Sequence, residues 1–164
     1  VNRIANTFPD YARGTVGQVH VKPNSRNVVP GEVRMTVDFR NAKQKTLDAM
    51  VDELKASAAR IATECRVGVD LKEVVTFAPS EFAPALVEGV RAGAKARGYS
   101  HRDIVSGAAH DAVYMARIAP TAMVFVPCEG GISHNEIENA RSEDIAAGCN
   151  VLLDAVLSAA GTAS

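Results

Sequence analysis

The sequence predicts an α+β layer followed by an α/β layer, and three patterns point to this fold class. Two segments near the start alternate apolar and polar residues, as half-buried strands do. A helical stripe then runs from Lys43 to about Glu64. After Pro79, short and continuously apolar runs alternate with helical patterns, which is typical of strands buried on both faces of a sheet. We therefore expect a boundary near residues 78–79, with residues 1–78 and 79–164 forming different layers.

The first part contains three expected strands and one long helix. Residues 15–22 alternate, with Val16, Gln18 and His20 on the wetter face, and residues 33–40 alternate more cleanly. Turn formers fill the segment between these two strands. The valine-rich segment 67–77 predicts a third strand after the helix. The order strand, turn, strand, helix, strand indicates antiparallel pairing.

The second part contains two expected buried strands and three helices. Ser80 is a suitable N-cap for a helix that ends near Gly98. The apolar runs 104–105 and 122–126 predict strands, and residues 109–117 between them predict a short helix. Ser142 begins a last helix with an apolar stripe made of Ile145, Cys149, Leu152, Leu153 and Val156. This alternation favours an α/β layer.

Composition argues against two classes of partner. The 164 residues include 18 basic and 19 acidic side chains, with a formal net charge of -1 and no run of Lys or Arg. Binding to nucleic acid or to an anionic membrane surface depends on clustered cations, so we expect neither. The most apolar stretch, 118–128, contains two prolines and is far shorter than the roughly 20 residues that a membrane-spanning helix needs.

The cysteines favour a reducing compartment, and the first residues suggest that the chain is part of a longer protein. Cys65, Cys128 and Cys149 are far apart and form no C-x-x-C pair. A disulfide framework or a structural zinc site is therefore disfavoured, and we expect a reducing, cytoplasmic compartment. Because Val1 replaces an initiator methionine and the helical spacing begins at once, we also expect that the chain is cut from a longer polypeptide.

Two glycine-flanked segments each contain one histidine. His110 lies in the segment 106–112, and His134 lies in the segment 129–136. Each segment follows an expected buried strand, where loops of α/β sheets gather ligand sites. Imidazole suits metal ligation or proton transfer. On spacing alone, a hydrogen-bonding surface histidine remains the alternative for both.

Asn27 and Arg40 form a second candidate pair. Arg40 ends an expected strand, where its guanidinium could hold a carboxylate through two parallel hydrogen bonds, and Asn27 could add a donor. The alternative is that Arg40 pairs with Asp38 or with solvent. Position alone leaves both interpretations open.

Together these segments resemble a known family, the hydantoinase/carbamoylase-type amidases of the M20 metallopeptidase superfamily. That group includes N-carbamoyl-L-amino acid hydrolase, β-ureidopropionase and allantoate amidohydrolase. The resemblance runs through most of the chain in one order, which is more specific than any single motif. The matching segments are Thr15-Val16-Gly17, residues 23–31, Asp38-Phe39-Arg40, residues 106–112, Phe125-Val126-Pro127, Gly131-Ile132-Ser133-His134 and the closing helix.

The resemblance implies a two-domain subunit. Residues 79–164 would form the C-terminal part of a zinc-peptidase-like α/β catalytic domain. Residues 1–78 would form the later part of an inserted lid with an antiparallel sheet, through which two subunits form a homodimer. We therefore expect this chain to contain adjoining parts of two larger domains.

The resemblance also implies roles for individual residues. His134 would be a ligand of a two-metal centre, and His110 would bind substrate near the scissile group, in a loop that has Ala109 where the family usually has Gly. Asn27 and Arg40 would grip the substrate carboxylate, within one subunit or across the dimer interface. The backbone at Gly130 and Gly131 would line the same pocket. The remaining metal ligands and the catalytic base would lie outside this chain, so no catalytic residue is expected within it.

The implied reaction is metal-dependent hydrolysis of a ureido C–N bond. Two divalent metal ions per complete subunit, which could be zinc, manganese, cobalt or nickel, would activate water and polarise the carbonyl. An N-carbamoyl-L-amino acid would give the amino acid, carbon dioxide and ammonia. Two alternatives stay open: an allantoate amidohydrolase, and an isolated chain that serves as a non-catalytic module for dimerisation and substrate gripping.

Overall fold

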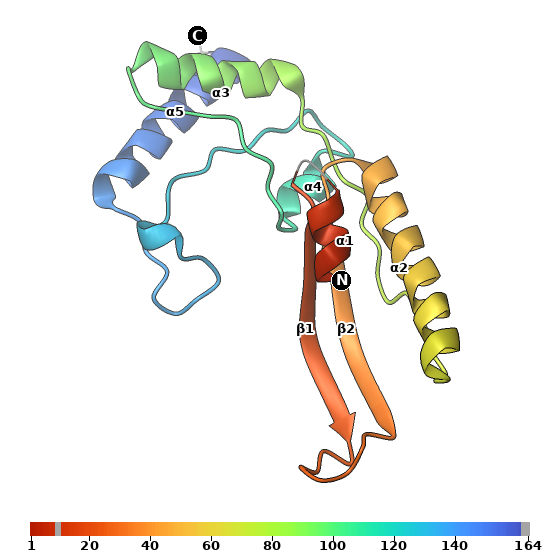
Figure 1. Cartoon of the computed structure of the whole chain (residues 1–164). Coiled ribbons are helices and arrows are strands. Elements are labelled where there is room, and N and C mark those ends of the chain that lie inside the picture. Colours follow the sequence, from red (N-terminus) through yellow and green to blue (C-terminus); the bar gives the residue numbers. More distant parts are fainter. Residues whose placement is uncertain (9–10, 162–164) are drawn as a thin grey trace. The chain divides into compact units, whose positions relative to one another are not determined.

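The computed structural model describes residues 1–8 and 11–161 and contains helices and one two-stranded sheet (Figure 1). The elements in chain order are α1 (Asn2–Thr7), β1 (Arg13–Lys22), β2 (Glu32–Arg40), α2 (Gln44–Cys65), α3 (Pro84–Ala96), α4 (Asp111–Met115), the 3-10 turn η1 (Glu129–Gly131) and α5 (Ser142–Ala160).

The chain divides into two compact units. Unit 1 comprises Val1–Pro79 and Val105–Gly107, and unit 2 comprises Ser80–Ile104 and Ala108–Ser164. Their assignment to a lid and a catalytic domain remains a prediction. The segment 105–107 belongs to unit 1 although its sequence neighbours belong to unit 2.

Unit 1 is built on an antiparallel hairpin of β1 and β2, which confirms the first two expected strands. A bulge at Gly17 shifts the register, because Val16 pairs with Val37 whereas Gln18 pairs with Thr36. The extra residue turns Val16 onto the apolar face. Our sequence-based placement of Val16 on the wetter face was therefore wrong, since strict alternation does not account for an inserted residue.

Two helices contact the hairpin. The short helix α1 contacts β1, and the long helix α2, which confirms the expected helix, contacts β2. Ile4 of α1 and Met50 of α2 are buried, and Met50 is fully so at 0% exposure. Gly14 makes this packing possible, because a Cβ there would lie 2.9 Å from both Ala5 Cβ and Phe39 Cε1.

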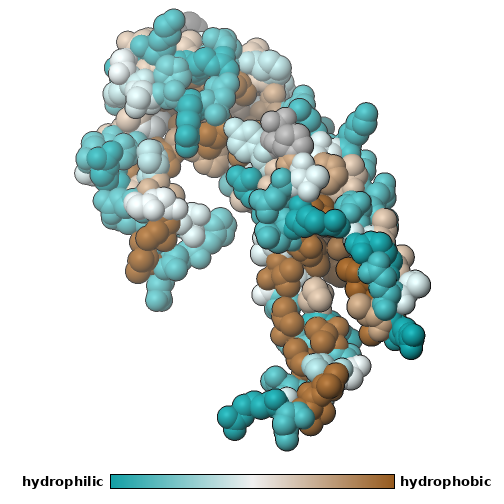
Figure 2. Space-filling view, viewed as in Figure 1, coloured by the Kyte–Doolittle hydropathy of each residue, from teal (hydrophilic) through white to brown (hydrophobic). Residues whose placement is uncertain are grey.

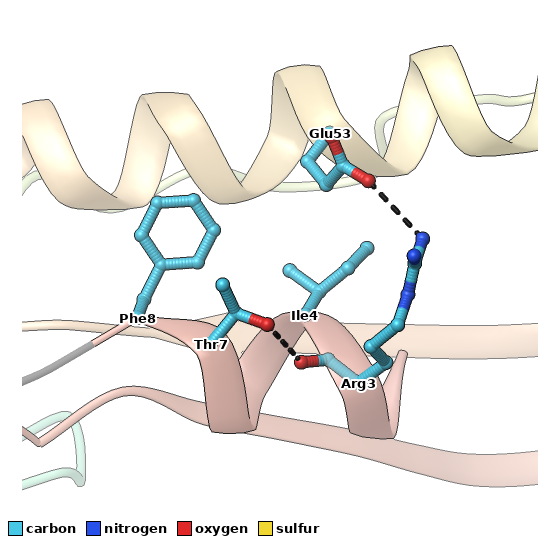
Figure 3. A pocket seen from close by; sticks show the side chains of 5 residues that line it. All are labelled: Arg3, Ile4, Thr7, Phe8 and Glu53. Atoms are coloured by element: carbon cyan, nitrogen blue, oxygen red, sulfur yellow. Dashed lines mark hydrogen bonds and ion pairs between the residues drawn. The ribbon is translucent and has the colours of Figure 1, made fainter.

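A shallow cleft lies between α1 and α2 (Figure 3). It measures about 220 Å³ and is lined by Arg3, Ile4, Thr7, Phe8 and Glu53. Arg3 Nη2 donates to Glu53 Oε1 at 3.2 Å across it. A second shallow cleft lies on the polar face of the hairpin, around His20 and Arg34. These two clefts contain none of the predicted site residues.

Unit 2 contains α3 packed against α5. Gly93 allows close approach, since a Cβ there would lie 3.4 Å from Asp154 Cβ. Arg97 holds Asp154 with two bonds, Nε to Oδ2 at 2.5 Å and Nη2 to Oδ1 at 2.8 Å. The contact thus combines small-residue packing with a planar ion pair.

The expected boundaries of the unit 2 helices held in part. Helix α5 begins at Ser142, as expected, and Gly98 follows the end of α3 with φ +70°, in agreement with its expected role. The expected start at Ser80 was wrong, because α3 begins at Pro84. Proline favours the first helical position and disfavours helical conformation in the residue before it. The expected helix over residues 109–117 is limited to α4.

Three expected strands were not confirmed. Within the described residues, segments 67–77, 104–105 and 122–126 contain no strand. Strands require hydrogen bonds to a neighbouring strand, and periodicity in a sequence does not supply that neighbour. In the first of these segments Val74 is 87% exposed. These segments are apolar, as the sequence indicated, but the pairing that we expected does not occur among the residues that the structure describes.

Apolar side chains also remain exposed along the outer half of the hairpin (Figure 2). Val19 pairs with Met35 on the apolar face, and both are more than half exposed. Among the described residues, no helix is both long and apolar enough to cross a membrane.

Candidate functional site

Arg40 is the last residue of β2, and neighbouring groups hold its guanidinium at three points. Nε donates to Asp38 Oδ1 at 2.7 Å, and Nη2 donates to Asp38 Oδ2 at 3.1 Å. Nη1 donates to the Gly107 carbonyl at 2.6 Å. The hydrogen bonds from Arg40 to Asp38 raise the Arg40 pKa above its ordinary value, so the side chain carries its charge at every working pH.

The structure confirms the alternative in which Arg40 pairs with Asp38, and Arg40 still keeps N–H groups that could bind a further acceptor. A guanidinium has five N–H groups, and the bonds to Asp38 and Gly107 use three of them. One N–H on Nη1 and one on Nη2 remain for a further acceptor. Half of the Arg40 side chain is exposed, at 50%. An incoming carboxylate could therefore reach it.

Asn27 lies in the turn that joins β1 to β2. Its Oδ1 accepts a hydrogen bond from Ser25 Oγ at 2.9 Å, and its side chain is exposed. Arg40 ends the nine-residue strand β2 that starts after this turn. At about 3.3 Å per strand residue, roughly 26 Å separates the first and last residues of that strand. The structure therefore does not bring Asn27 and Arg40 of one chain together.

His110 precedes α4 in unit 2 and is half-buried. Its ring contacts the ring of Phe125 edge-on, with the centroids 5.6 Å apart and the planes at 65°. Phe125 belongs to the apolar segment 122–126. The imidazole thus packs edge-on against this apolar segment, an arrangement that aromatic rings favour.

Gly130 and Gly131 form the turn η1, and both adopt left-handed conformations, with φ +61° and +70°. Such values favour glycine because a Cβ would be strained there. A Cβ on Gly131 would meet nothing within 4 Å, while the Gly131 N–H already donates to the Cys128 carbonyl at 3.0 Å. These glycines are therefore required by the turn, whether or not they also line a pocket.

His134 lies further along the same loop, also with a positive φ of 57°. Its backbone N–H donates to Glu138 Oε2 at 2.6 Å, and its Nδ1 lies 3.3 Å from Ser133 Oγ. The loop is closed by Glu129 and Asn139, whose bonds run from Glu129 N to Asn139 O at 2.7 Å and from Asn139 Nδ2 to Glu129 Oε2 at 2.8 Å. Its own residues thus hold the loop in shape.

The described residues do not by themselves fit a metal centre. Among them, no three His, Cys, Asp or Glu side chains converge as ligands would. His134 could supply one imidazole, whereas a two-metal centre needs several ligands. The position of the other ligands and the role of His134 both remain predictions.

Asp38 and Glu138 have local roles beyond those that the sequence analysis assigned. Asp38 was considered as an alternative partner that would occupy Arg40, and the structure shows that it orients Arg40 while leaving two N–H groups. Glu138 was not among the predicted site residues, but its carboxylate accepts a hydrogen bond from the His134 backbone N–H. The four-residue spacing from His134 to Glu138 resembles a local turn bond, which is the signal that could have found it.

Comparisons with known proteins identify the family. The model of peptidase family M20/M25/M40 matches residues 6–158. An N-carbamoyl-L-amino-acid amidohydrolase of Rhizobium meliloti is 49% identical over 149 residues, which are 91% of this chain and 36% of that protein. An allantoate amidohydrolase of Bacillus subtilis is 30% identical over 150 residues, 92% of this chain and 36% of that protein.

The fold agrees with the sequence comparison. A crystal structure of an amidase of the hydantoinase/carbamoylase family from Burkholderia multivorans superposes with a TM-score of 0.95 at 50% identity, covering 100% of this chain and 40% of that one. The chain spans 36% of the length of the curated relatives named above. The sequence and the fold together place this chain in the M20 peptidase family, alongside its hydantoinase/carbamoylase-type amidases.

Proposed function

We propose that the whole protein to which this chain belongs is a metal-dependent amidohydrolase that cleaves the ureido C–N bond of N-carbamoyl-L-amino acids. The products are the amino acid, carbon dioxide and ammonia. The observation that carries the proposal is the 49% identity to a protein named for this activity, spread over 91% of the chain. The described geometry supports it with a cation suited to the carboxylate that such substrates carry.

Arg40 binds that carboxylate in this proposal. Its bonds to Asp38 and Gly107 leave one N–H on each terminal nitrogen that can donate to a carboxylate oxygen. His110 contacts the reacting end of the substrate, and the backbone at Gly130 and Gly131 lines the same pocket. Each of these roles is assigned from the family resemblance and is compatible with the local geometry described above.

Asn27 adds a donor to the same carboxylate from a second copy of the chain. The length of β2 separates Asn27 from Arg40 within one chain by more than a small substrate spans. If both residues contact one carboxylate, they therefore come from different subunits. The proposal accordingly includes a homodimer formed through the hairpin region, and the exposed Val19 and Met35 offer apolar surface for it.

His134 supplies one metal ligand in this proposal. Its ring is presented by a loop whose backbone is already closed by Glu138, Glu129 and Asn139. Zinc, manganese, cobalt and nickel all suit imidazole and carboxylate ligands. The free thiols Cys65, Cys128 and Cys149 favour a reducing compartment, and we place the protein in the cytoplasm.

A second candidate function is allantoate hydrolysis. The 30% identity to an allantoate amidohydrolase supports it. Allantoate is also a ureido acid, so Arg40 would have the same carboxylate to bind. The two candidates differ in the substrate preferred and not in the bond cleaved.

The test is a substrate panel on the whole protein, purified with its metal. N-carbamoyl-L-alanine, allantoate and a dipeptide are compared by ammonia or amino-acid release. We expect the highest kcat/KM with N-carbamoyl-L-alanine, whereas a preference for allantoate selects the second candidate. Hydrolysis of the dipeptide alone rejects both. The 164-residue chain is assayed in parallel, and we expect it to be inactive as a gripping module without the remaining ligands.

A further inference from the structure

We propose that Asp38 is a positioning residue that orients Arg40 for the substrate carboxylate. The inference rests on the proposed function, because it assigns a purpose to the Arg40 geometry in that reaction. Asp38 itself would not contact substrate. It would act by fixing which N–H groups of Arg40 remain available and in which direction they point.

The contacts define the orientation of the guanidinium completely. Asp38 occupies the side-on edge of Arg40, with one oxygen on Nε and the other on Nη2. The Gly107 carbonyl takes one N–H of Nη1. Because a guanidinium is planar and rigid, three bonds to two separate groups fix both its plane and its rotation. The two N–H groups left over then point in fixed directions.

Stabilisation of the fold does not account for the pair. Asp38 and Arg40 are both about half exposed, at 52% and 50%. Exposed ion pairs contribute little to stability, because water screens the charges and ordering long side chains costs entropy. Asp38 and Arg40 lie two residues apart on one strand, so the bonds between them cross-link no distant elements, and the link to the segment 105–107 is made by Arg40 Nη1 alone. What it does supply is the orientation of one cation.

The charge around the pair leaves the surface suited to an anion. Arg13 pairs with Arg40 across the two strands, and Asp38 pairs with Thr15. The two arginines and Asp38 lie on the same face of the hairpin, since residues two apart on a strand and their cross-strand partners share a face. Asp38 therefore compensates one positive charge and leaves one. A substrate carboxylate would complete the neutralisation.

The test compares a carboxylate substrate with its neutral amide in the whole, metal-loaded protein. The probes are N-carbamoyl-L-alanine and N-carbamoyl-L-alaninamide, the latter measured by KM or by inhibition. Asp38→Asn keeps the size but removes the charge and one of the two acceptors. We expect KM for N-carbamoyl-L-alanine to rise about tenfold, the effect of one weakened charged hydrogen bond, with kcat nearly unchanged. The KM or inhibition constant of N-carbamoyl-L-alaninamide should not change, because the amide lacks the carboxylate.

Two further variants serve as controls. Asp38→Glu retains the charge but moves the carboxylate by one methylene, so its selectivity should lie between those of the wild type and Asp38→Asn. Glu32→Gln removes an exposed ion pair with Lys22 at the other end of the same strand and should leave both probes unchanged. Each variant is judged by the ratio of the constants for the two probes. Both constants are measured on the same preparation, so a loss of folded protein affects them equally and leaves the ratio unchanged.

The outcomes separate the inference from the proposed function. The quantity compared is the KM for the amide divided by the KM for N-carbamoyl-L-alanine. If Asp38→Asn leaves this ratio unchanged while Arg40→Lys lowers it, the positioning role is overturned and the proposed function stands. Equal effects of Arg40→Lys on both probes show that Arg40 is structural and overturn the inference together with the carboxylate role. A wild-type protein that hydrolyses no ureido acid rejects the proposed function itself.

Discussion

His134 adopts a backbone conformation that costs a non-glycine residue about 1 kcal/mol or more, yet its loop holds it there. The Glu138 carboxylate accepts its N–H, and the Glu129–Asn139 bonds close the loop around it. Such strain persists where surrounding bonds overdetermine it, and it is concentrated at functional sites. This makes His134 a stronger candidate for a role than its sequence spacing alone did.

The His134→Ala substitution tests that role in the whole protein. If His134 is a metal ligand, its removal should reduce the bound metal to a small fraction of the wild-type content and nearly abolish turnover. Metal content is measured by elemental analysis after dialysis. His101→Ala is the matched control, because His101 is an exposed loop histidine with its Nδ1 at 3.0 Å from the Tyr99 carbonyl. Unchanged metal in His134→Ala removes it from the ligand set.

Residue types in the site were predictable from sequence, but their distances were not. The Asp38-Phe39-Arg40 segment contains both partners of the ion pair, so the Arg40–Asp38 contact could be considered in advance. Asn27 and Arg40 were grouped because both suit a carboxylate. Their separation depends on the length of β2 and on the hairpin closing where it does, which are properties of the fold and not of residue type.

At the scale of elements, sequence predicted those whose stabilising partners are local. The hairpin and α2 pair with sequence neighbours, and both were found. Segments 67–77 and 122–126 were expected as strands because they are apolar, but a strand requires a partner that periodicity does not identify. The bulge at Gly17 could not be predicted from the sequence for a similar reason, since it depends on how β1 pairs with the opposing strand.

A pair of glycine substitutions tests the packing inferred for α5. A Cβ on Gly148 would lie 2.5 Å from Val126 Cγ1, a stiff side chain that cannot move away cheaply. We expect Gly148→Ala to destabilise the protein by about 1 kcal/mol or more, as overpacking does. Gly89→Ala in α3 is the control, because nothing lies within 4 Å of its Cβ. Helix propensity alone should stabilise that variant by up to about 1 kcal/mol.

The measurement is the urea dependence of unfolding, followed by circular dichroism. The two substitutions should shift the midpoint in opposite directions. If Gly148→Ala stabilises as much as Gly89→Ala, then α5 does not pack against Val126 in the way described.

The α3–α5 ion pair predicts how stability depends on acid. The hydrogen bonds from Arg97 lower the Asp154 pKa below its ordinary value of 3.8. A depressed folded-state pKa means that the stabilising contribution is full above the unfolded pKa and is lost as the pH falls through the folded value. Asp154→Asn should therefore lower the thermal midpoint at pH 7, and the difference from wild type should shrink as the pH falls below 3.8 through the lowered folded-state pKa.

The control for this experiment is Asp52→Asn, which alters an exposed acid of α2 in the other unit. It should shift the midpoint little at either pH. A constant difference between wild type and Asp154→Asn from pH 7 down to pH 2 would show that the ion pair with Arg97 is not what Asp154 contributes.

At the scale of the whole molecule, the chain has more apolar surface than its own elements cover. Val74 is 87% exposed and Val29 is 88% exposed, and Val19 and Met35 leave the outer hairpin apolar (Figure 2). The chain spans 36% of the length of the two curated relatives named above. An apolar surface of this kind is typical of a polypeptide that packs against further protein. The proposed homodimer assigns part of that surface, the hairpin, to a second copy.

Subunit mixing tests whether Asn27 and Arg40 of different copies share one substrate. Asn27→Ala and Arg40→Lys are each expected to be poorly active toward N-carbamoyl-L-alanine. In a mixed dimer, the site that uses Arg40 of the Asn27→Ala subunit receives Asn27 from the Arg40→Lys subunit and is intact, while the other site has lost both residues. Random reassociation of equal amounts makes about half of the dimers mixed, so about a quarter of all sites should be wild type.

The experiment is to unfold or dissociate the two variants, mix them, reassociate them and measure kcat/KM against each variant treated alone. Activity should rise on mixing to about a quarter of that of the wild-type protein treated in the same way. Mixing Arg40→Lys with a double variant, Asn27→Ala/Arg40→Lys, is the control and should restore nothing, because neither subunit offers an intact Arg40. If the variants fail to complement although mixed dimers form, both residues act on a substrate within one subunit or Asn27 does not bind substrate, and the span of β2 makes the second explanation the stronger.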